Sequence, residues 1–252
     1  MLLKLIACNV FLREACLCVA DSPHVIDVEF SELGEHARPA GLRELIQARV
    51  DAADAADAGG KAYDAVLLLY GVCGNATVGL RARRAPLVLP RAHDCATVLL
   101  GSRRRFEAHF KDAPSTPFGS GGFVERGSYF LHMTGEGGPA VVAGDAFAEL
   151  VRRYGEEDAR YVWSQMHPED GPAQRTVFID VPETAHLGHR AAFERKAAEA
   201  GKSVEHLSGD LRLIRMLVGG AWDPAEFLVV RPGEEVAGVY DWDEIVKGRR
   251  VE

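Results

Sequence analysis

The stretch that decides the fold is Val66–Ser102, with the sequence VLLLYGVCGNATVGLRARRAPLVLPRAHDCATVLLGS. It contains two short aliphatic runs, Val66–Leu69 and Pro86–Leu89, each closed by a nearby glycine or proline. Uninterrupted aliphatic runs of this length are typical of parallel strands that are covered on both faces. Each run is followed a few residues later by a cysteine, Cys73 or Cys95. Because open α/β sheets bind ligands at the carboxyl ends of their strands, both cysteines are candidates for a functional site.

The same pattern opens the chain, where the apolar run Leu2–Ala7 is followed directly by Cys8. Three cysteines at three strand ends would give a soft metal ion three sulfur ligands and leave one coordination position open. A structural zinc site would instead show paired C-x-x-C spacing. We therefore predict a metal site formed by Cys8, Cys73 and Cys95. The alternative is that some of them are merely small buried residues, since free cysteine is among the most buried residue types.

Strand and helix patterns alternate along the rest of the chain. Further strands are predicted over Pro23–Phe30, Thr176–Val181, Val204–Leu207 and Phe227–Val230. Helices are predicted over Asn9–Ala20, Pro39–Ala58, Thr77–Arg84, Ala96–Phe110, Phe147–Trp163, Leu187–Ala200 and Asp210–Val218. The alternation predicts an α/β fold with a doubly wound, mostly parallel, Rossmann-like sheet and helices on both faces.

The length of 252 residues suits a single α/β domain over residues 1–252. Within it we distinguish a three-cysteine half over residues 1–110 and a second α/β half over residues 139–252. Residues 111–138 between them are rich in glycine and aromatic residues. A long stretch of this kind inside a domain is more often a functional loop or lid than a plain connection.

The net charge of −8 argues against nucleic acid or an anionic membrane surface as the main partner. The cluster Arg81, Arg83 and Arg84 is better explained as a solvated connection between a helix and a strand than as a phosphate site. No apolar run approaches the roughly 20 residues that span a bilayer. Five cysteines without a regular framework favour reduced thiols over disulfides. We expect a cytoplasmic protein that acts on a small-molecule substrate.

The step His93-Asp94-Cys95 adds further chemistry to the second cysteine motif. His93 is a candidate fourth ligand or general acid–base. Asp94 would orient the histidine or cap the following helix through the backbone N–H of Thr97. The first turn of the predicted helix Ala96–Phe110 would lower the pKa of the Cys95 thiol, because free N–H groups and the helix dipole favour an anion there.

Five residues near these motifs are candidates for binding a substrate: Arg13, Gly74, Asn75, Arg91 and Ser102. Arg91 would bind a carboxylate or phosphate in a bidentate manner. Arg13 follows Cys8 by about one helical turn, and its neighbour Glu14 cannot share the same helix face. The chain has no dinucleotide fingerprint, phosphate loop or G-x-S-x-G elbow, and dinucleotide and ATP chemistry are therefore disfavoured.

These motifs resemble the uncharacterised bacterial and archaeal family DUF1638. The resemblance is carried by LIACNVFLRE, LYGVCGNATVGL, PLVLPRAHDCATVLLGSRRRF, GDLRLIRMLVGGAWDPAEFLVVRPG and YDWDE, and it runs from about residue 3 to residue 244. Members of this family are often encoded near corrinoid-dependent methyltransferases. The resemblance therefore implies one-carbon or methylamine metabolism, with a corrinoid protein or a methyltransferase as a partner.

The first hypothesis is a metal-dependent transferase that moves a methyl or another group, with zinc as the preferred metal. Zinc held by thiolates lowers the pKa of a bound substrate thiol and makes it a nucleophile. A [4Fe–4S] cluster with one open iron is the alternative cofactor, for a lyase or a sulfur-transfer enzyme. A protein that handles a metal or a corrinoid without turnover is the second alternative. The third is a metal-free enzyme with Cys95 as nucleophile and His93 as base.

Overall fold

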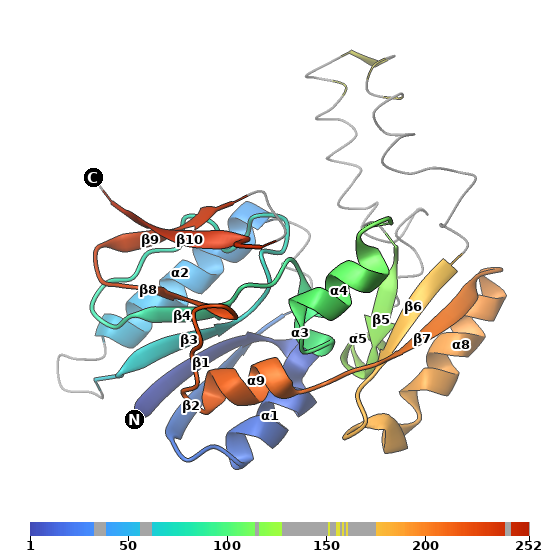
Figure 1. The fold of residues 1–252 in the computed structure, drawn as a ribbon, viewed down its shortest axis with the longest axis horizontal. Helices are drawn as coiled ribbons and strands as arrows, with labels where there is room; N and C mark the ends of the chain where they lie inside the picture. The colour runs from blue at the N-terminus through green and yellow to red at the C-terminus, as the bar shows by residue number, and fades with distance from the viewer. Residues whose placement is uncertain are drawn as a thin grey trace. The chain divides into compact units, whose positions relative to one another are not determined.

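The computed structural model describes residues 1–32, 39–55, 62–113, 116–127, 175–239 and 243–251, together with residues 151, 155, 156, 158 and 160 (Figure 1). The chain divides into two compact units. Unit 1 consists of Met1–Glu107 and Asp210–Glu252, and unit 2 of Ala108–Gly209. Each unit has its own sheet, so each is considered by itself.

Unit 1 is built on a five-stranded sheet with the order β2-β1-β3-β4-β8 (Figure 1). Its strands are β1 (Leu2–Cys8), β2 (Val25–Ser31), β3 (Ala65–Leu69), β4 (Leu87–Pro90) and β8 (Phe227–Val230). The first four strands pair in parallel, and β8 is antiparallel to β4. The predicted α/β class, the mostly parallel sheet and these five strands are confirmed.

The aliphatic runs form strands for the reason expected from the sequence. Every residue of β3 and of β4 is buried, so both strands are covered by protein on both faces. Burying a valine or leucine side chain contributes about 1.5–3 kcal/mol relative to leaving it exposed. These two strands therefore anchor the centre of unit 1 and fix the ends of the loops that follow them.

The helices of unit 1 include η1 (Asn9–Phe11), α1 (Leu12–Ala20), α2 (Pro39–Ala55) and α9 (Arg212–Val218). They confirm the helices predicted over Asn9–Ala20, Pro39–Ala58 and Asp210–Val218, apart from residues 56–58, which lie outside the described residues. Helices α1 and α9 pack against each other (Figure 1). Within the described ranges, no helix has both the length and the apolar character needed to cross a bilayer.

The helix predicted over Thr77–Arg84 is wrong. Residues 73–79 form turns, and the backbone beyond them pairs with β9 (Glu234–Gly238). The Gly79 N–H donates to the Val236 carbonyl at 2.7 Å, and the Val236 N–H donates to the Leu80 carbonyl at 2.8 Å. Strand β9 also forms an antiparallel hairpin with β10 (Val246–Arg250), which the sequence patterns did not indicate.

The single helix predicted over Ala96–Phe110 is also wrong, because two helices occupy the range. They are α3 (Cys95–Leu99) and α4 (Arg103–Phe110). Gly101 between them has a φ of +67°, which side-chain-bearing residues rarely adopt. A Cβ atom on Gly101 would lie 2.7 Å from the Asp210 carbonyl oxygen, so the chain needs a glycine here for space as well.

Unit 2 contains a second, three-stranded parallel sheet with the order β5-β6-β7. Its elements are β5 (Phe118–Ser120), α5 (Gly121–Glu125), β6 (Arg175–Asp180), η5 (Ala185–Leu187), α8 (His189–Glu199) and β7 (Ser203–Ser208). Phe178 and Phe193 pack together in its core. Elements β5 and α5 fall within the predicted loop or lid, whose residues 128–138 lie outside the described residues. The helix predicted over Phe147–Trp163 also lies almost wholly outside them.

Candidate functional site

The strand order of unit 1 brings the three predicted metal ligands to one edge of the sheet. Strands β1, β3 and β4 are consecutive neighbours and run in parallel, so their carboxyl ends lie side by side (Figure 1). Cys8 is the last residue of β1, and Cys73 and Cys95 follow β3 and β4. The order of the chain also reverses between β1 and β3, and ligands of open α/β sheets bind at such a reversal.

The loops that follow β3 and β4 lie directly against each other. The Val72 N–H donates to the Ala92 carbonyl at 2.9 Å, and the Cys73 N–H donates to the His93 carbonyl at 3.2 Å. Between these loops there is no room for a side chain at Gly71, because a Cβ atom there would lie 2.5 Å from the Asp94 Cα atom. Gly71 therefore lets the two cysteine motifs approach each other.

The cysteine of the first loop sits in an unusual backbone conformation. Cys73, Gly74 and Asn75 have φ values of 48°, 64° and 72°, so three successive residues are left-handed. For a residue with a side chain this costs about 1–2 kcal/mol. Strain of this kind persists only where the surrounding structure imposes it, and it concentrates at functional sites.

The three thiols lie close enough to affect one another. Cys8 and Cys95 are buried, and Cys73 is half-buried. A hydrogen bond between the side chains of Cys95 and Cys73, then burial, then the negative charges of Cys73, Cys8 and Asp94 raise the pKa of Cys95 well above its usual value. The expectation that a helix start lowers this pKa is wrong. Helix α3 has only five residues, and the neighbouring acidic groups and loss of water outweigh its backbone dipoles.

Asp94 fulfils the capping role predicted for it. Its side chain accepts a hydrogen bond from the Thr97 backbone N–H at 3.2 Å at the start of α3. Burial nevertheless raises the pKa of Asp94 to about 7, and the charge of Cys73 adds to the increase, although hydrogen bonds from Thr97 and Ala96 oppose it. A carboxyl group with a pKa near neutrality is able to accept or donate a proton under physiological conditions.

His93 lies on an aromatic side chain. Its ring stacks on Phe106 with a centroid separation of 5.5 Å and an interplanar angle of 28°. The His93 carbonyl accepts the Cys73 N–H, which ties the backbones of the two motifs together. The proposed roles of His93 as ligand or general acid–base stay predictions.

Sequence patterns missed Tyr70 and Ser31, which lie at the same sheet edge. Because Ala7 pairs with Leu69, the next residues, Cys8 and Tyr70, lie level on neighbouring strands. The Tyr70 hydroxyl forms a buried 2.8 Å hydrogen bond with the Ser31 hydroxyl. Burial raises the pKa of Tyr70 above its usual range, and the charges of Cys8 and Cys73 raise it further. The signal for Tyr70 in the sequence was its position directly after a buried aliphatic run.

The predicted substrate-binding residues occupy several different environments. Arg91 donates from Nε to the Pro224 carbonyl and from a terminal nitrogen to the Glu244 carbonyl, both at 2.9 Å, and also to the Val246 carbonyl. Its guanidinium thus joins three backbone segments of unit 1. The Ser102 hydroxyl accepts the Arg105 N–H at 3.4 Å, which makes Ser102 the cap of α4.

The remaining substrate candidates are exposed. Arg13 is exposed on α1, whereas its neighbour Glu14 is buried, as expected for adjacent residues on a helix. Gly74 and Asn75 are exposed in the left-handed turn. The substrate-binding roles of all five candidates stay predictions.

Among the residues described, no group of three or more His, Cys, Asp or Glu side chains is arranged as it stands to hold a metal ion. The close contact is between two thiols, those of Cys73 and Cys95, with Cys8 within electrostatic range. Cys16 is exposed and Cys18 is buried, because residues two apart on a helix point in different directions.

A family model described as "Protein of unknown function (DUF1638)" matches residues 30–218. The chain belongs to this family. The DUF1638 match contains the Cys73 and His93-Asp94-Cys95 motifs, and it begins after Cys8 and Arg13. No curated protein and no solved structure matches the chain.

Proposed function

We propose that the chain is an enzyme whose three strand-end thiols bind a soft metal and use it to transfer a methyl or another group. The observation that carries this proposal is the convergence of Cys8, Cys73 and Cys95 at one edge of the sheet. Packing of the sheet does not require three cysteines at the ends of three neighbouring strands. Each of them lies at the carboxyl end of a strand, where α/β folds bind ligands.

The donor set fits a soft metal in its chemistry. Thiolates are preferred ligands of zinc and of iron–sulfur clusters, and three of them leave one position for a substrate. Binding would replace the present hydrogen bond between Cys73 and Cys95 and bring the Cys8 thiol toward them. Zinc is the first choice, and a [4Fe–4S] cluster with an open iron is the alternative. Either would act as a Lewis acid toward a bound substrate group.

The chain itself would supply the proton acceptor that this chemistry requires. Cys95 must lose its proton to become a ligand, and its raised pKa makes that loss unfavourable without help. Asp94, whose pKa is about 7, is a nearby acceptor that is partly ionised at neutral pH. His93 is the candidate acid–base group on the substrate side. Arg13, Gly74 and Asn75 are exposed candidates for contacting the substrate.

We also infer the winding of the sheet, the cellular location and the partner, from general rules and from the family resemblance. Parallel crossovers are right-handed, so the connections β1-α1-β2 and β2-α2-β3 would place α1 and α2 on opposite faces and make the sheet doubly wound. Reduced thiols favour the cytoplasm. The one-carbon context that the family resemblance implies would give the enzyme a small-molecule substrate and a corrinoid protein or a methyltransferase as partner.

The metal content of protein purified without oxygen tests this proposal. We expect about one zinc per chain without visible absorption, or about four irons with matching sulfide and a brown colour. The Cys95→Ser variant should lose this metal, and the Cys16→Ser variant, altered at an exposed position, should keep it. A wild-type protein that contains neither metal and takes up neither on reconstitution would contradict the proposal.

One observation favours a second candidate function, a metal- or corrinoid-handling protein without turnover. The Arg91 guanidinium holds backbone carbonyls together, so the group expected to bind an anionic substrate serves the fold. A handling protein would pass its metal to an apo-acceptor in a single stoichiometric event. Repeated turnover of a methyl donor by the metal-loaded chain would instead support the enzyme.

A further inference from the structure

Cys73 and Cys95 form a preorganised thiol pair. The backbone bonds from Val72 and Cys73 to the β4 loop, and the contact of Gly71 with Asp94, hold the two loops in a fixed relation. Within this frame the two side chains are hydrogen-bonded to each other. Disulfide formation needs the sulfurs to approach to about 2 Å from suitably placed backbones, and the hydrogen bond already places the two thiols next to each other.

The two members of the pair differ in access. Cys73 is half-buried next to the exposed Gly74 and Asn75, whereas Cys95 is only 5% exposed. Cys8 is 0% exposed at the end of β1. A small oxidant in solution would therefore reach Cys73 first, and the nearest thiol to respond would be Cys95.

We propose that an oxidant closes Cys73 and Cys95 into a disulfide and thereby removes two of the three metal ligands, so that the site is under redox control. The control of metal binding rests on the proposed metal function, whereas the disulfide itself does not. Reduction by cellular thiols would restore both ligands, because thiol–disulfide exchange is reversible.

The step balances with hydrogen peroxide as oxidant. The Cys73 thiolate attacks one peroxide oxygen; an S–O bond forms, the O–O bond breaks, and the departing hydroxide takes a proton to become water. The Cys95 sulfur then attacks the Cys73 sulfenic acid; the S–S bond forms, the S–O bond breaks, and the hydroxide leaves with the Cys95 proton as a second water. Two thiols are oxidised by two electrons, and peroxide is reduced to two waters.

Cys95 suits the second of these roles. Because it is only 5% exposed, peroxide in solution reaches it poorly and reacts with it slowly. This division, an accessible thiol that reacts first and a buried thiol that resolves it, is typical of redox-sensing cysteine pairs.

Disulfide mapping of the whole chain tests the thiol pair. Reduced, metal-free protein is treated with a small excess of hydrogen peroxide, blocked with iodoacetamide, digested and analysed by mass spectrometry. We expect one linked peptide pair, containing Cys73 and Cys95, in the wild type and in Cys16→Ser, and no such link in Cys95→Ala. Overoxidation of Cys73 without a link, or a link from Cys73 to Cys8, would overturn the proposal, and the wild-type map alone suffices to decide this.

Zinc titration of the reduced and oxidised forms tests the regulation. Loss of a single outer-shell partner already weakens metal binding roughly 10–100-fold, so we expect the disulfide form to bind zinc more than about 100-fold more weakly. Equal binding by both forms would overturn the redox control. If the reduced protein binds no zinc or iron, the proposed function fails, while the mapping still decides whether the thiol pair exists.

Discussion

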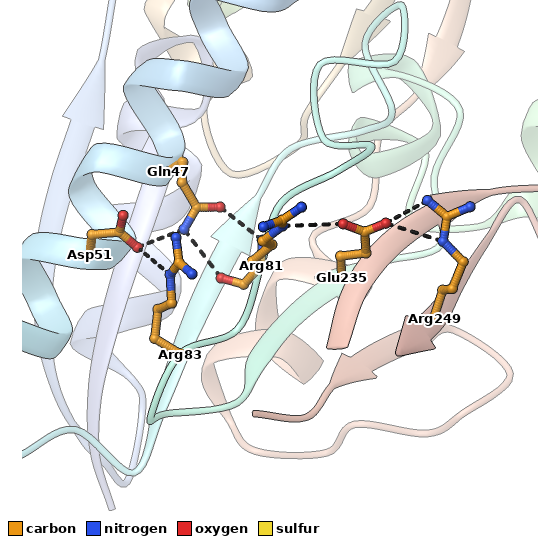
Figure 2. Close-up of polar contacts among 6 residues, drawn as sticks. All are labelled: Gln47, Asp51, Arg81, Arg83, Glu235 and Arg249. Carbon is orange, nitrogen blue, oxygen red and sulfur yellow. Dashed lines mark hydrogen bonds and ion pairs between the residues drawn. The ribbon is translucent and has the colours of Figure 1, made fainter. Parts of the chain in front are cut away.

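Polar groups at the two edges of the unit 1 sheet have opposite kinds of neighbours. At the carboxyl edge, burial and the negative charge of Cys73 both raise the pKa values of Cys95 and Asp94. At the amino edge, where the chain enters β3 and β4, carboxylates face guanidinium groups (Figure 2). We call this second group the arginine network, and it consists of Gln47, Asp51, Arg81, Arg83, Glu235 and Arg249.

The arginine network joins α2, the segment before β4 and the β9–β10 hairpin. Glu235 accepts from Arg81 Nε at 3.2 Å and from Arg249 Nε at 3.1 Å, and Arg83 Nε donates to Asp51 at 3.1 Å (Figure 2). Gln47 donates to the carbonyl of Arg81 and accepts its backbone N–H. Arg81 and Arg83 thus belong to a solvated, charge-paired connection, as expected, although no helix precedes them.

The two edges move carboxyl pKa values in opposite directions. Hydrogen bonds and charge from Arg249, and then from Arg81, lower the pKa of Glu235, whereas burial raises that of Asp94 to about 7. Pairing with arginine favours the ionised form of a carboxyl group. A carboxyl group that is costly to ionise and lies beside thiols is the kind that functional sites use. The opposite shifts of these two carboxyl pKa values support the proposed site at the carboxyl edge.

The largest expected effect is that of Gly71→Ala at the carboxyl edge. The added methyl group would lie 2.5 Å from the Asp94 Cα atom, and backbone cannot move aside cheaply. Overpacking of this kind costs about 1–3 kcal/mol, and we expect the upper end in urea unfolding. The matched control is Gly233→Ala, where a Cβ atom meets nothing within 4 Å and only the φ of +84° opposes it. Equal losses in both variants would show that the loops are not in close contact.

The second prediction concerns the pH dependence of stability and uses Asp94→Asn in chelator-treated protein. The folded pKa of Asp94, about 7, lies above its ordinary value of 3.8, so folding favours the protonated form. Its contribution is fully present below pH 4 and is lost as pH rises to 7, at up to about 1.4 kcal/mol per pKa unit. Asparagine does not ionise, so the variant should become progressively more stable than the wild type as pH rises from 4 to 8. A parallel pH profile for variant and wild type in urea titrations would contradict this.

The third prediction concerns Tyr70→Phe, which removes one partner of the buried bond to Ser31. A buried hydroxyl left without its partner costs about 1–3 kcal/mol. The double variant with Ser31→Ala should recover part of that loss, because no unsatisfied hydroxyl remains. Additive losses in this double-mutant cycle would show that the two hydroxyls do not interact in solution.

The smallest effect is expected at the amino edge, for Arg249→Ala. The Arg249 side chain is 66% exposed, and exposed ion pairs contribute about 0–1 kcal/mol. We expect a loss below about 1 kcal/mol that shrinks further in high salt. A loss as large as that of Gly71→Ala would mean that the arginine network, and not the packing of the cysteine loops, holds unit 1 together.

The strands of unit 1 could be predicted because the apolar composition of each run by itself indicates that the run is buried. The runs at Val66–Leu69 and Pro86–Leu89 are apolar throughout, and their burial on both faces requires no knowledge of other segments. The cysteines could likewise be placed at strand ends. The family assignment followed from the same motifs and is confirmed by the family match.

The errors arose where distant segments decide the local structure. Residues 79–82 pair with β9, which lies more than 150 residues later, and this contact replaces the predicted helix. Gly101 breaks a continuous helical pattern because Asp210 packs against it. The direction of the Cys95 pKa depends on which strands are neighbours, and periodicity carries no information about strand order.

The central claim, that Cys8, Cys73 and Cys95 form one metal-binding site, is tested most directly by titrating the reduced protein with cadmium. Cadmium–thiolate absorption counts the sulfur ligands around the ion. We predict saturation at one cadmium per chain, with the absorption falling by about a third in each of Cys8→Ser, Cys73→Ser and Cys95→Ser as one of three soft ligands is lost. Cys16→Ser should match the wild type. Wild-type absorption in Cys8→Ser would contradict the account, because it would leave Cys73 and Cys95 as a thiol pair without a third ligand.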